Sequence, residues 1–338
     1  MKLKSITALL LVLIICIFTS ACAPAQDNQK DSTKDEAPKE ETSSQDEAQG
    51  TSDIATTPLL YKVTDEDGDV VWLFGSIHIG RQDYYPLPDY VMDAFEGSES
   101  LAVEGDIIAF EKDLSMQIQA LQPLLYTDGT TISDHIPRDL YDQAKEILDE
   151  LGYYNKAMDY YCPAFWSSYI DTAIYEELGA ETELGIDRHL LKKAKDTDKP
   201  ILEIESALEQ YTMLGGFSEE LQELLLSESI ESWNDIDATE ETLTQMMDLW
   251  AQGNEEKFSD FLSEEDEGMT AEELDLYEEY NTALLDDRNL NMTDYAEERL
   301  ELGEETFICV GAAHIVGEGA MVELLAQRGY TIECIPQQ

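Results

Sequence analysis

Positive charge is scarce in this sequence. Only 20 Lys and Arg residues stand against 74 Asp and Glu, so the 338 residues carry a formal net charge of −54, and there are four histidines. Proteins bind nucleic acid or anionic lipid through clustered Lys and Arg, so the composition argues against both partners. The excess carboxylates attract cations and cationic substrates only diffusely. We expect most of them to form a solvated surface that resists aggregation.

Cysteine is also rare, with five in the chain. Cys16 lies in the amino-terminal apolar stretch and Cys22 shortly after it, which leaves Cys162, Cys309 and Cys334 for the folded part. Their spacing matches no zinc ribbon, which argues against a structural thiolate metal site. Outside the cytoplasm, three cysteines form at most one disulfide. Cys309 and Cys334, expected on neighbouring strands, are the pair to consider, and buried free thiols are the alternative.

The amino end lacks an apolar run of membrane-spanning length. Ala8 to Phe18 is apolar but short, and it follows the basic start Met1-Lys-Leu-Lys. We therefore interpret residues 1–21 as a signal peptide. Its end, Phe18-Thr-Ser-Ala-Cys22, resembles a bacterial lipobox, in which small residues precede a cysteine that becomes diacylated and amino-terminal. Ordinary signal cleavage beside an incidental cysteine is the alternative.

Residues 22–57 contain almost nothing apolar and are rich in Gln, Asp, Glu, Lys, Ser, Thr and Pro. Such a segment cannot bury enough surface to order itself, so we predict a flexible stalk. Together, lipobox and stalk predict a protein anchored through lipidated Cys22 on the extracytoplasmic side of the cell membrane. The remaining residues, 58–338, are enough for one large domain or two closely joined ones.

Two short stretches near opposite ends of this domain share one pattern. Val70 to Gly80 and Thr306 to Gly317 each consist of an apolar run, then Gly-x-x-His, then another glycine. An apolar run rich in β-branched and aromatic residues predicts a buried strand, and its terminal glycine allows a sharp turn. Each histidine, His78 and His314, is thus expected just past a strand end. We expect both to converge on one site at the carboxyl edge of a sheet.

The intervening sequence predicts further strands and many helices. Leu59 to Thr64 and Val70 to Phe74 flank a turn and predict a hairpin. Ser100 to Asp106 and Lys199 to Glu205 read as strands that end in carboxylates, among them Glu104 and Glu205. Helices are expected between them and from Ser218 to Leu302, and an aromatic helix at Pro163 to Leu178 is expected to be core. The pattern predicts an α/β fold: a mixed sheet core of two related Gly-x-x-His halves flanked by helices, with a helical insertion.

Two imidazoles and a carboxylate at strand ends form a plausible ligand set for a divalent metal with open positions for water and substrate. This assigns His78, Glu104 and His314 as metal ligands, with Glu104 as an alternative general base. Taken singly, either histidine has an ordinary structural role as its alternative. Ser76 precedes His78 but lacks the nucleophile-elbow pattern, which argues against a serine hydrolase. Arg288 is a conspicuous cation that pairs with neighbouring aspartates, or binds a substrate carboxylate or an oxyanion.

At these residues the sequence resembles the TraB/GumN family, which is related to the Tiki metalloproteases and more distantly to ChaN-like and erythromycin-esterase-like proteins. The resemblance covers nearly all of the chain after the stalk and rests on six motifs in order: Gly75-Ser-Ile-His78, Ala102-Val-Glu-Gly-Asp106, Gly185-Ile-Asp-Arg-His-Leu190, Glu205-Ser-Ala-Leu-Glu-Gln210, Arg288-Asn-Leu-Asn-Met292 and Val310-Gly-Ala-Ala-His314. The family often carries Thr where this chain has Ser76, a change that keeps the hydroxyl.

The resemblance implies metal-dependent peptide hydrolysis, with Mn²⁺ or Co²⁺ as the metal and Zn²⁺ as a further candidate. His78, Glu104 and His314 match the family's metal positions, and Arg288 matches its recurring arginine. The candidate catalytic residues are then Glu104 and Arg288. The candidate substrate-binding residues are Ser76, Glu205, Arg288 and Asn289.

Three hypotheses follow for the function. The first is a lipid-anchored metallohydrolase, a Tiki-like peptidase in which metal-activated water attacks a peptide carbonyl. The second is a non-catalytic lipoprotein that sequesters a secreted peptide pheromone. The third is an esterase that acts on a small molecule. Turnover, metal content and the choice between peptide and ester substrates separate them.

Overall fold

The computed structural model describes residues 56–263 and 268–336. The predicted signal peptide (residues 1–21), the predicted lipidation site Cys22 and nearly all of the predicted stalk lie outside the described residues. Among the helices that are described, none is both long and apolar enough to cross a membrane.

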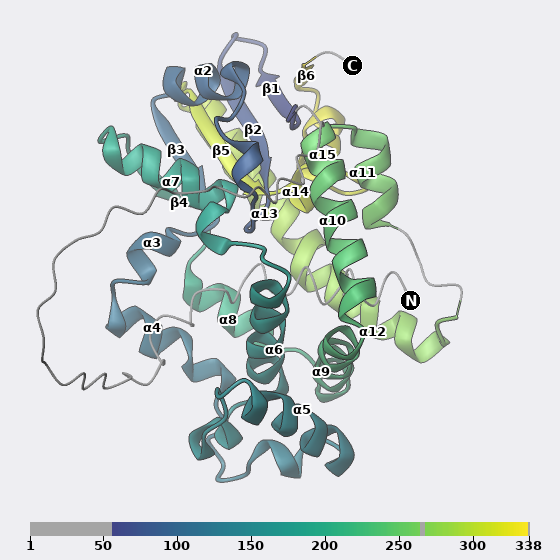
Figure 1. Cartoon of the computed structure of the whole chain (residues 1–338). Helices are drawn as coiled ribbons and strands as arrows, with labels where there is room; N and C mark the ends of the chain where they lie inside the picture. Colours follow the sequence, from purple (N-terminus) through teal and green to yellow (C-terminus); the bar gives the residue numbers. More distant parts are fainter. Residues whose placement is uncertain (1–55, 264–267, 337–338) are drawn as a thin grey trace, which may run out of the picture.

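A six-stranded mixed sheet occupies the upper part of the molecule in Figure 1. Its strand order is β4-β3-β5-β2-β1-β6. The strands are β1 (Leu60–Thr64), β2 (Val70–Ser76), β3 (Ser100–Val103), β4 (Ile201–Glu203), β5 (Thr306–Gly311) and β6 (Thr331–Ile335). The neighbours β4, β3, β5 and β2 run parallel, whereas β1 pairs antiparallel with both β2 and β6. The chain is an α/β protein, and four adjacent strands end at one edge of its sheet.

The central strands are buried because helices cover the sheet. Every residue of β3 and β5 is buried, which suits their continuous apolar sequences. One apolar core joins the sheet to surrounding helices, of which six contribute most of the helical residues. They are α2 (Asp89–Gly97), α7 (Ile186–Asp196), α10 (Ile236–Gln252), α11 (Glu255–Leu262), α13 (Asp287–Glu301) and α15 (Met321–Gln327).

The predicted hairpin of β1 and β2 is confirmed, and its turn is built around Asp65. One carboxylate oxygen of Asp65 accepts the backbone N–H groups of Asp67, Gly68 and Asp69, each at 2.9 Å. Gly68 has φ of 92°, a left-handed conformation that glycine adopts without steric cost. The turn fixes the register between β1 and β2, and β2 leads directly into the segment that carries His78.

A second apolar core lies in the helices below the sheet (Figure 1). Its residues come mainly from α5 (Arg138–Glu150), α6 (Pro163–Glu177), α8 (Ala207–Gly215), α9 (Glu219–Asn234) and the end of α12 (Ala271–Asn281). Phe165, Trp166 and Tyr169 of α6 belong to this core. The aromatic helix is therefore core, as predicted.

The sequence pattern predicts one helix from Ile107 to Leu121 and another from Gly317 to Arg328, and the structure differs in three details. The first of these is two helices, α3 (Ile107–Phe110) and α4 (Leu114–Ala120). The carboxylate of Asp113 accepts the backbone N–H groups of Ser115 and Met116, and this cap starts the second helix. The helix expected from Gly317 begins later, as α15. A short helix, α14 (Ala312–Ile315), directly follows β5 and carries His314.

Of the two alternatives left open for Cys309 and Cys334, the structure has the free thiols and not the disulfide. Both residues, with Cys162, are free cysteines. Cys309 lies on β5 and Cys334 on β6, and the strands β2 and β1 separate the two in the sheet. The expectation that they sit on neighbouring strands came from sequence proximity, but β6 pairs with the amino-terminal strand instead.

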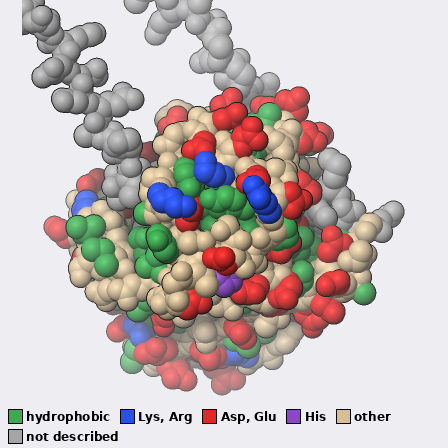
Figure 2. Space-filling model, turned by 90° about the horizontal axis from the view of Figure 1, so that it is seen from below, with side chains coloured by type: hydrophobic (Ala, Val, Ile, Leu, Met, Phe, Trp, Pro, Cys, Tyr) green, Lys and Arg blue, Asp and Glu red, His purple; other side chains and the backbone are tan. Residues whose placement is uncertain are grey.

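The surface is strongly acidic. In the view of Figure 2, Asp and Glu side chains are spread around the molecule, whereas Lys and Arg side chains are few. This distribution fits the predicted solvated acidic surface.

Candidate functional site

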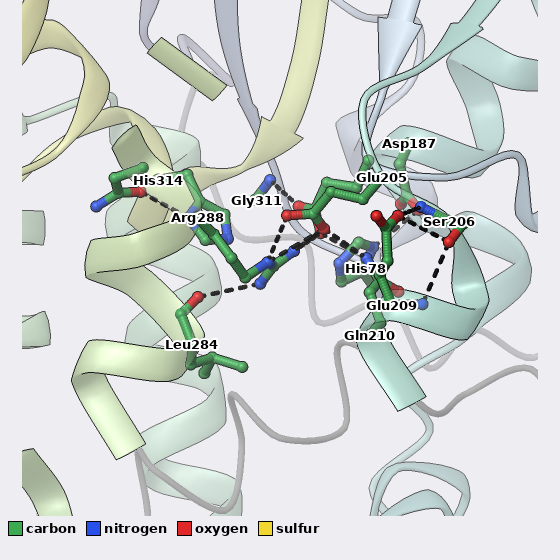
Figure 3. A network of polar contacts seen from close by, with 12 residues as sticks. His78, Asp187, Glu205, Ser206, Glu209, Gln210, Leu284, Arg288, Gly311 and His314 are labelled. Atoms are coloured by element: carbon green, nitrogen blue, oxygen red, sulfur yellow. Dashed lines mark hydrogen bonds and ion pairs between the residues drawn. The ribbon is translucent and has the colours of Figure 1, made fainter. Parts of the chain in front are cut away.

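Polar side chains from four neighbouring strand ends enter one region. His78 follows β2 by two residues, Glu104 follows β3 directly, Glu205 follows β4 by two residues, and His314 lies on α14 after β5. Since these strands are parallel neighbours, their carboxyl ends meet at one edge of the sheet. Figure 3 shows Arg288, from α13, between His314 and His78. The predicted convergence of the two Gly-x-x-His stretches on one edge is thus observed.

Asp187 holds His78 in a fixed orientation. The ring Nδ1 of His78 lies 2.8 Å from Oδ2 of Asp187. Gly185 allows this contact, because a Cβ at that position would lie 2.4 Å from the backbone oxygen of His78. The backbone N–H of Ile186 donates to the carbonyl of Ile77 at 2.9 Å, which fastens the start of α7 to the His78 segment.

This pairing fixes where the His78 ring accepts protons. When the neutral ring donates Nδ1–H to Asp187, its lone pair lies on Nε2. Burial alone would lower the pKa of His78, but the negative charge of Asp187 and its hydrogen bond raise that pKa above the ordinary value. Asp187 therefore stabilises the protonated ring and orients the neutral one.

Glu104 and Glu205 share one guanidinium. Nη2 of Arg288 lies 2.6 Å from Glu104 and 2.8 Å from Glu205, and Nε donates to Glu205 at 2.8 Å. Nη1 donates to the carbonyl of Leu284 at 3.1 Å. The other oxygen of Glu104 accepts the backbone N–H of Gly311 at 2.7 Å. Both oxygens of Glu104 are therefore engaged.

These contacts keep Glu104 ionised. Burial raises the pKa of its carboxyl, but the positive charge of Arg288, the two nearby imidazoles and the Gly311 N–H together lower it to about 2. The influence of His78 and His314 on this one carboxylate shows that all three side chains share one electrostatic environment. Burial lowers the pKa of Arg288, but its two carboxylate partners raise it. The pKa therefore lies above its ordinary value.

Asn289 holds the second histidine. Nδ1 of His314 lies 2.7 Å from Oδ1 of Asn289, and the amide nitrogen of Asn289 donates to the carbonyl of Gly319 at 3.1 Å. The Gly319 contact fixes the amide so that its oxygen faces the ring. Burial, reinforced by the charge of Arg288, lowers the pKa of His314 to about 3, so the ring is neutral at physiological pH. Its lone pair then also lies on Nε2.

The donor set fits a metal ion only in part. Both histidines have Nδ1 anchored by an oxygen acceptor, the usual support of metal-binding imidazoles, and neither Nε2 bonds to a residue in the described ranges. Glu104, however, is paired with Arg288 and Gly311. Within the described part of the chain, no three His, Cys, Asp or Glu side chains form a group that could hold a metal ion. The described arrangement is therefore not a formed metal site, and metal dependence stays a prediction.

A pocket opens on the His78 side of this centre. It encloses about 560 Å³, including its open mouth, and His78, Glu104 and Asp187 line it together with apolar Ile107 and Phe110. The pocket gives a small polar group access to His78 while apolar walls exclude part of the water.

Ser76 also lines the pocket but does not act as a paired nucleophile. It is 2% exposed, and its hydroxyl oxygen has no hydrogen-bond partner among the described N and O atoms. The Nδ1 of His78 is bound to Asp187, and no described contact joins its ring to Ser76.

Two residues near the site were not assigned to it from the sequence. From the sequence, Asp187 is expected to be a cap or first-turn acid of the helix that opens at Gly185. It does lie in the first turn of α7, but its side chain bonds to His78 rather than to the helix end. Gln210 of α8 donates to Glu205 at 3.1 Å and approaches Glu104 at 3.4 Å. Both stand in the motifs that carry the family resemblance, which was the available signal.

His135 and His189 lack the strand-Gly-x-x-His setting, so the sequence predicts them in a loop and on a helix surface, and both lie away from the site. His135 bonds to Thr130 and Glu219 and stacks on Tyr126, in the helical part of the molecule. His189 lies on α7 and packs against a tyrosine ring. They serve as natural controls for the two site histidines.

Comparison with known proteins agrees with the motif pattern. The model of the TraB/PrgY/gumN family matches residues 59–334. The chain is similar to the "Uncharacterized protein YbaP" of Escherichia coli (strain K12), with 26% identity over 259 residues, which are 75% of this chain and 86% of that protein. The protein of the same name from Shigella flexneri matches to the same extent. No solved structure matches the chain significantly.

Proposed function

The chain belongs to the TraB/PrgY/gumN family, and we propose that it is a hydrolase that activates water at the centre formed by His78, Glu104 and His314. One observation carries this proposal. Two imidazoles, each with Nδ1 anchored by an oxygen acceptor, flank a buried carboxylate and a buried guanidinium at the edge of parallel strands. Gathering four charged or titratable groups in one place costs desolvation free energy. Such clusters of groups with shifted pKa values are typical of functional sites.

The chemistry of the proposed step follows from the hydrogen bonds. Nε2 of His78 accepts a proton from water while the water oxygen forms a bond to the substrate carbonyl carbon. Asp187 stabilises the resulting imidazolium. The proton then passes to the leaving nitrogen or oxygen as its bond to carbon breaks. For Arg288 to stabilise the negative charge that develops on the carbonyl oxygen, its guanidinium has to release one of its two carboxylate partners, Glu104 or Glu205.

Metal dependence is a separate part of the proposal. The Tiki resemblance predicts Mn²⁺ or Co²⁺, held by His78, Glu104 and His314. Such an ion lowers the pKa of its bound water when present. Binding through all three residues requires Glu104 to give up its contact with Arg288, so metal analysis tests the prediction directly.

The proposed substrate is a peptide, and the proposed location is the outer face of the cell membrane. The peptide follows from the Tiki resemblance. The location follows from the lipobox that ends at Cys22 and from the acidic stalk, both of which are sequence arguments.

The experiment uses the full chain in detergent with a peptide library and a panel of small esters, before and after treatment with a chelator and re-addition of Mn²⁺, Co²⁺ or Zn²⁺. The variants His78→Ala and His314→Ala are compared with His135→Ala and His189→Ala. We expect peptide cleavage that the first two variants lose and the last two retain.

Each other outcome has a defined meaning. Cleavage that survives both site substitutions contradicts the proposed centre. Cleavage that resists the chelator, in protein without bound metal, removes only metal dependence. Turnover of esters alone selects the esterase. Tight peptide binding without turnover, kept in all four variants, selects the non-catalytic binding lipoprotein.

A further inference from the structure

A long groove runs along the other side of the site, between α11, α12 and the loop that follows α14. It encloses about 1790 Å³, including its open mouth. Its walls combine apolar and aromatic side chains with polar ones in similar measure. The apolar and aromatic side chains include Leu262, Leu274, Leu285, Val316 and Tyr280. We call it the Gly317 groove, after the glycine on its loop wall.

The charged groups of the Gly317 groove all have one sign. Glu278, Asp286 and Glu318 line it, and no Lys or Arg is among the described residues that do so. All three carboxylates are exposed, and none forms an ion pair with another residue in the described ranges. Among the described residues, the groove thus presents three carboxylates without an ion-pair partner beside apolar side chains.

The groove adjoins the candidate site through Asn289. This residue lines the groove, and its side chain bonds both to His314 and to the backbone of Gly319, which lies in the groove's loop wall. Ala313, next to His314, lines the groove as well. A ligand lying in the groove thus contacts the residues that hold the His314 ring.

We infer that the Gly317 groove binds an extended segment of a basic peptide, with Lys or Arg side chains that face Glu278, Asp286 and Glu318. The aliphatic stems of Lys and Arg pack on apolar walls while their charged ends remain near the carboxylates, so one side-chain type satisfies both features of the groove. Complementary charge selects such a partner and speeds its encounter, and like charge excludes acidic peptides. That the bound peptide is a substrate rests on the proposed function; the binding does not.

The test measures binding to the full chain in a nonionic detergent by fluorescence anisotropy. Three labelled peptides of equal length and apolar content carry Lys and Arg, Gln, or Glu at the same positions. The groove variant combines Glu278→Gln, Asp286→Asn and Glu318→Gln. Its matched control combines Glu146→Gln, Glu150→Gln and Asp139→Asn, three exposed carboxylates of α5 without ion pairs in the described structure. Both variants lose the same net charge, and circular dichroism checks that both fold.

We expect the basic peptide to bind the wild type most tightly, and its Kd to rise about tenfold in the groove variant at low salt but little in the control. Raising the salt concentration should reduce the difference. Equal weakening in both variants would show a diffuse field and overturn the inference, as would equal binding of the three peptides. Binding that is groove-dependent without any cleavage would leave the groove assignment standing while the proposed hydrolase fails.

Discussion

At the scale of single residues, the protonation state of each group in the site depends on which residue contacts it. Asp187 raises the pKa of His78, whereas burial and Arg288 lower that of His314 to about 3. Two histidines in similar sequence settings thus differ in charge behaviour. The pKa of His78 lies above its ordinary value, so this ring titrates at a higher pH, whereas the His314 ring stays neutral at physiological pH.

Replacing Asp187 with Asn should lower the pKa of His78. The amide keeps the shape but removes the charge that raises this pKa, so burial then dominates and we expect the pKa of His78 to fall. The acidic limb of any activity that needs neutral His78 moves to lower pH accordingly. NMR titration of the His78 ring in chelator-treated protein measures the shift without an activity assay. An unchanged pKa would refute the role given to Asp187.

Replacing Arg288 with Gln should destabilise the fold strongly at neutral pH. The change leaves Glu104 and Glu205 buried without a counter-charge, which costs about 3–5 kcal/mol in comparable cases. The matched control is Arg328→Gln, whose partners Asp294 and Glu297 lie near the surface, with an expected loss of about 0–1 kcal/mol. Urea denaturation at pH 7 compares the two losses.

The pH dependence gives a second check on this ion pair. Glu104 has its pKa lowered to about 2 in the folded chain, so its pairing stabilises the protein above the unfolded-state pKa and is lost as the pH falls toward 2. The difference in the free energy of unfolding between wild type and the Arg288→Gln variant should therefore become smaller as the pH is lowered from 7 to 4. A difference in unfolding free energy that stays constant with pH would contradict the buried ion pair. Equal losses of unfolding free energy in the Arg288→Gln and Arg328→Gln variants at pH 7 would contradict it as well.

At the scale of elements, the site exists because separate helices are fastened to strand ends. The start of α7 lies against the His78 segment, α13 delivers Arg288, and α14 turns His314 away from β5. The α7 contact is the tightest of these, because Gly185 touches the backbone of His78.

Replacing Gly185 with Ala should therefore loosen α7 from the sheet. A Cβ at 2.4 Å from a backbone oxygen cannot be accommodated without movement, and overpacking of this kind costs about 1–3 kcal/mol. Gly97→Ala is the control, since a Cβ there meets nothing within 4 Å. It should be neutral or stabilising by up to about 1 kcal/mol. Denaturation curves of both variants measure their free energies of unfolding. A Gly185→Ala protein as stable as wild type would mean that α7 does not depend on the close contact between Gly185 and the backbone of His78.

At the scale of the whole molecule, the acidic surface opposes the two apolar cores. With 74 acidic and 20 basic residues, the negative charges repel one another, and on the face seen in Figure 2 Asp and Glu outnumber Lys and Arg. The apolar cores of the sheet and of the helical part offset this repulsion.

Screening this repulsion should stabilise the protein. Raising NaCl from about 10 mM to about 300 mM shortens the Debye length from roughly 30 Å to less than 10 Å. We expect the Tm of the full chain to rise by about 2 °C or more, which corresponds to about 1 kcal/mol for a domain of this size. Choline chloride at equal ionic strength should give the same rise. A Tm that stays constant or falls in both salts would contradict the repulsion argument.

The sequence by itself determined the fold class and the main participants of the site. Apolar runs that end in Gly-x-x-His or in a carboxylate predicted buried strands, because such runs satisfy their backbone only within a sheet covered on both faces. Parallel strands then bring His78, Glu104 and His314 to one edge. The motif order also identified the family that the comparisons show.

Tertiary structure alone decided how these groups are paired. Arg288 is 184 residues from Glu104 in the chain, and Asp187 is 109 from His78, so local sequence holds no record of either contact. It also placed β6 beside β1, which separates Cys309 from Cys334. Pairing depends on which helices cover the sheet edge and on close approaches such as that of Gly185. The sequence thus supplied the side chains at the strand ends, and packing determined which of them remain available for chemistry.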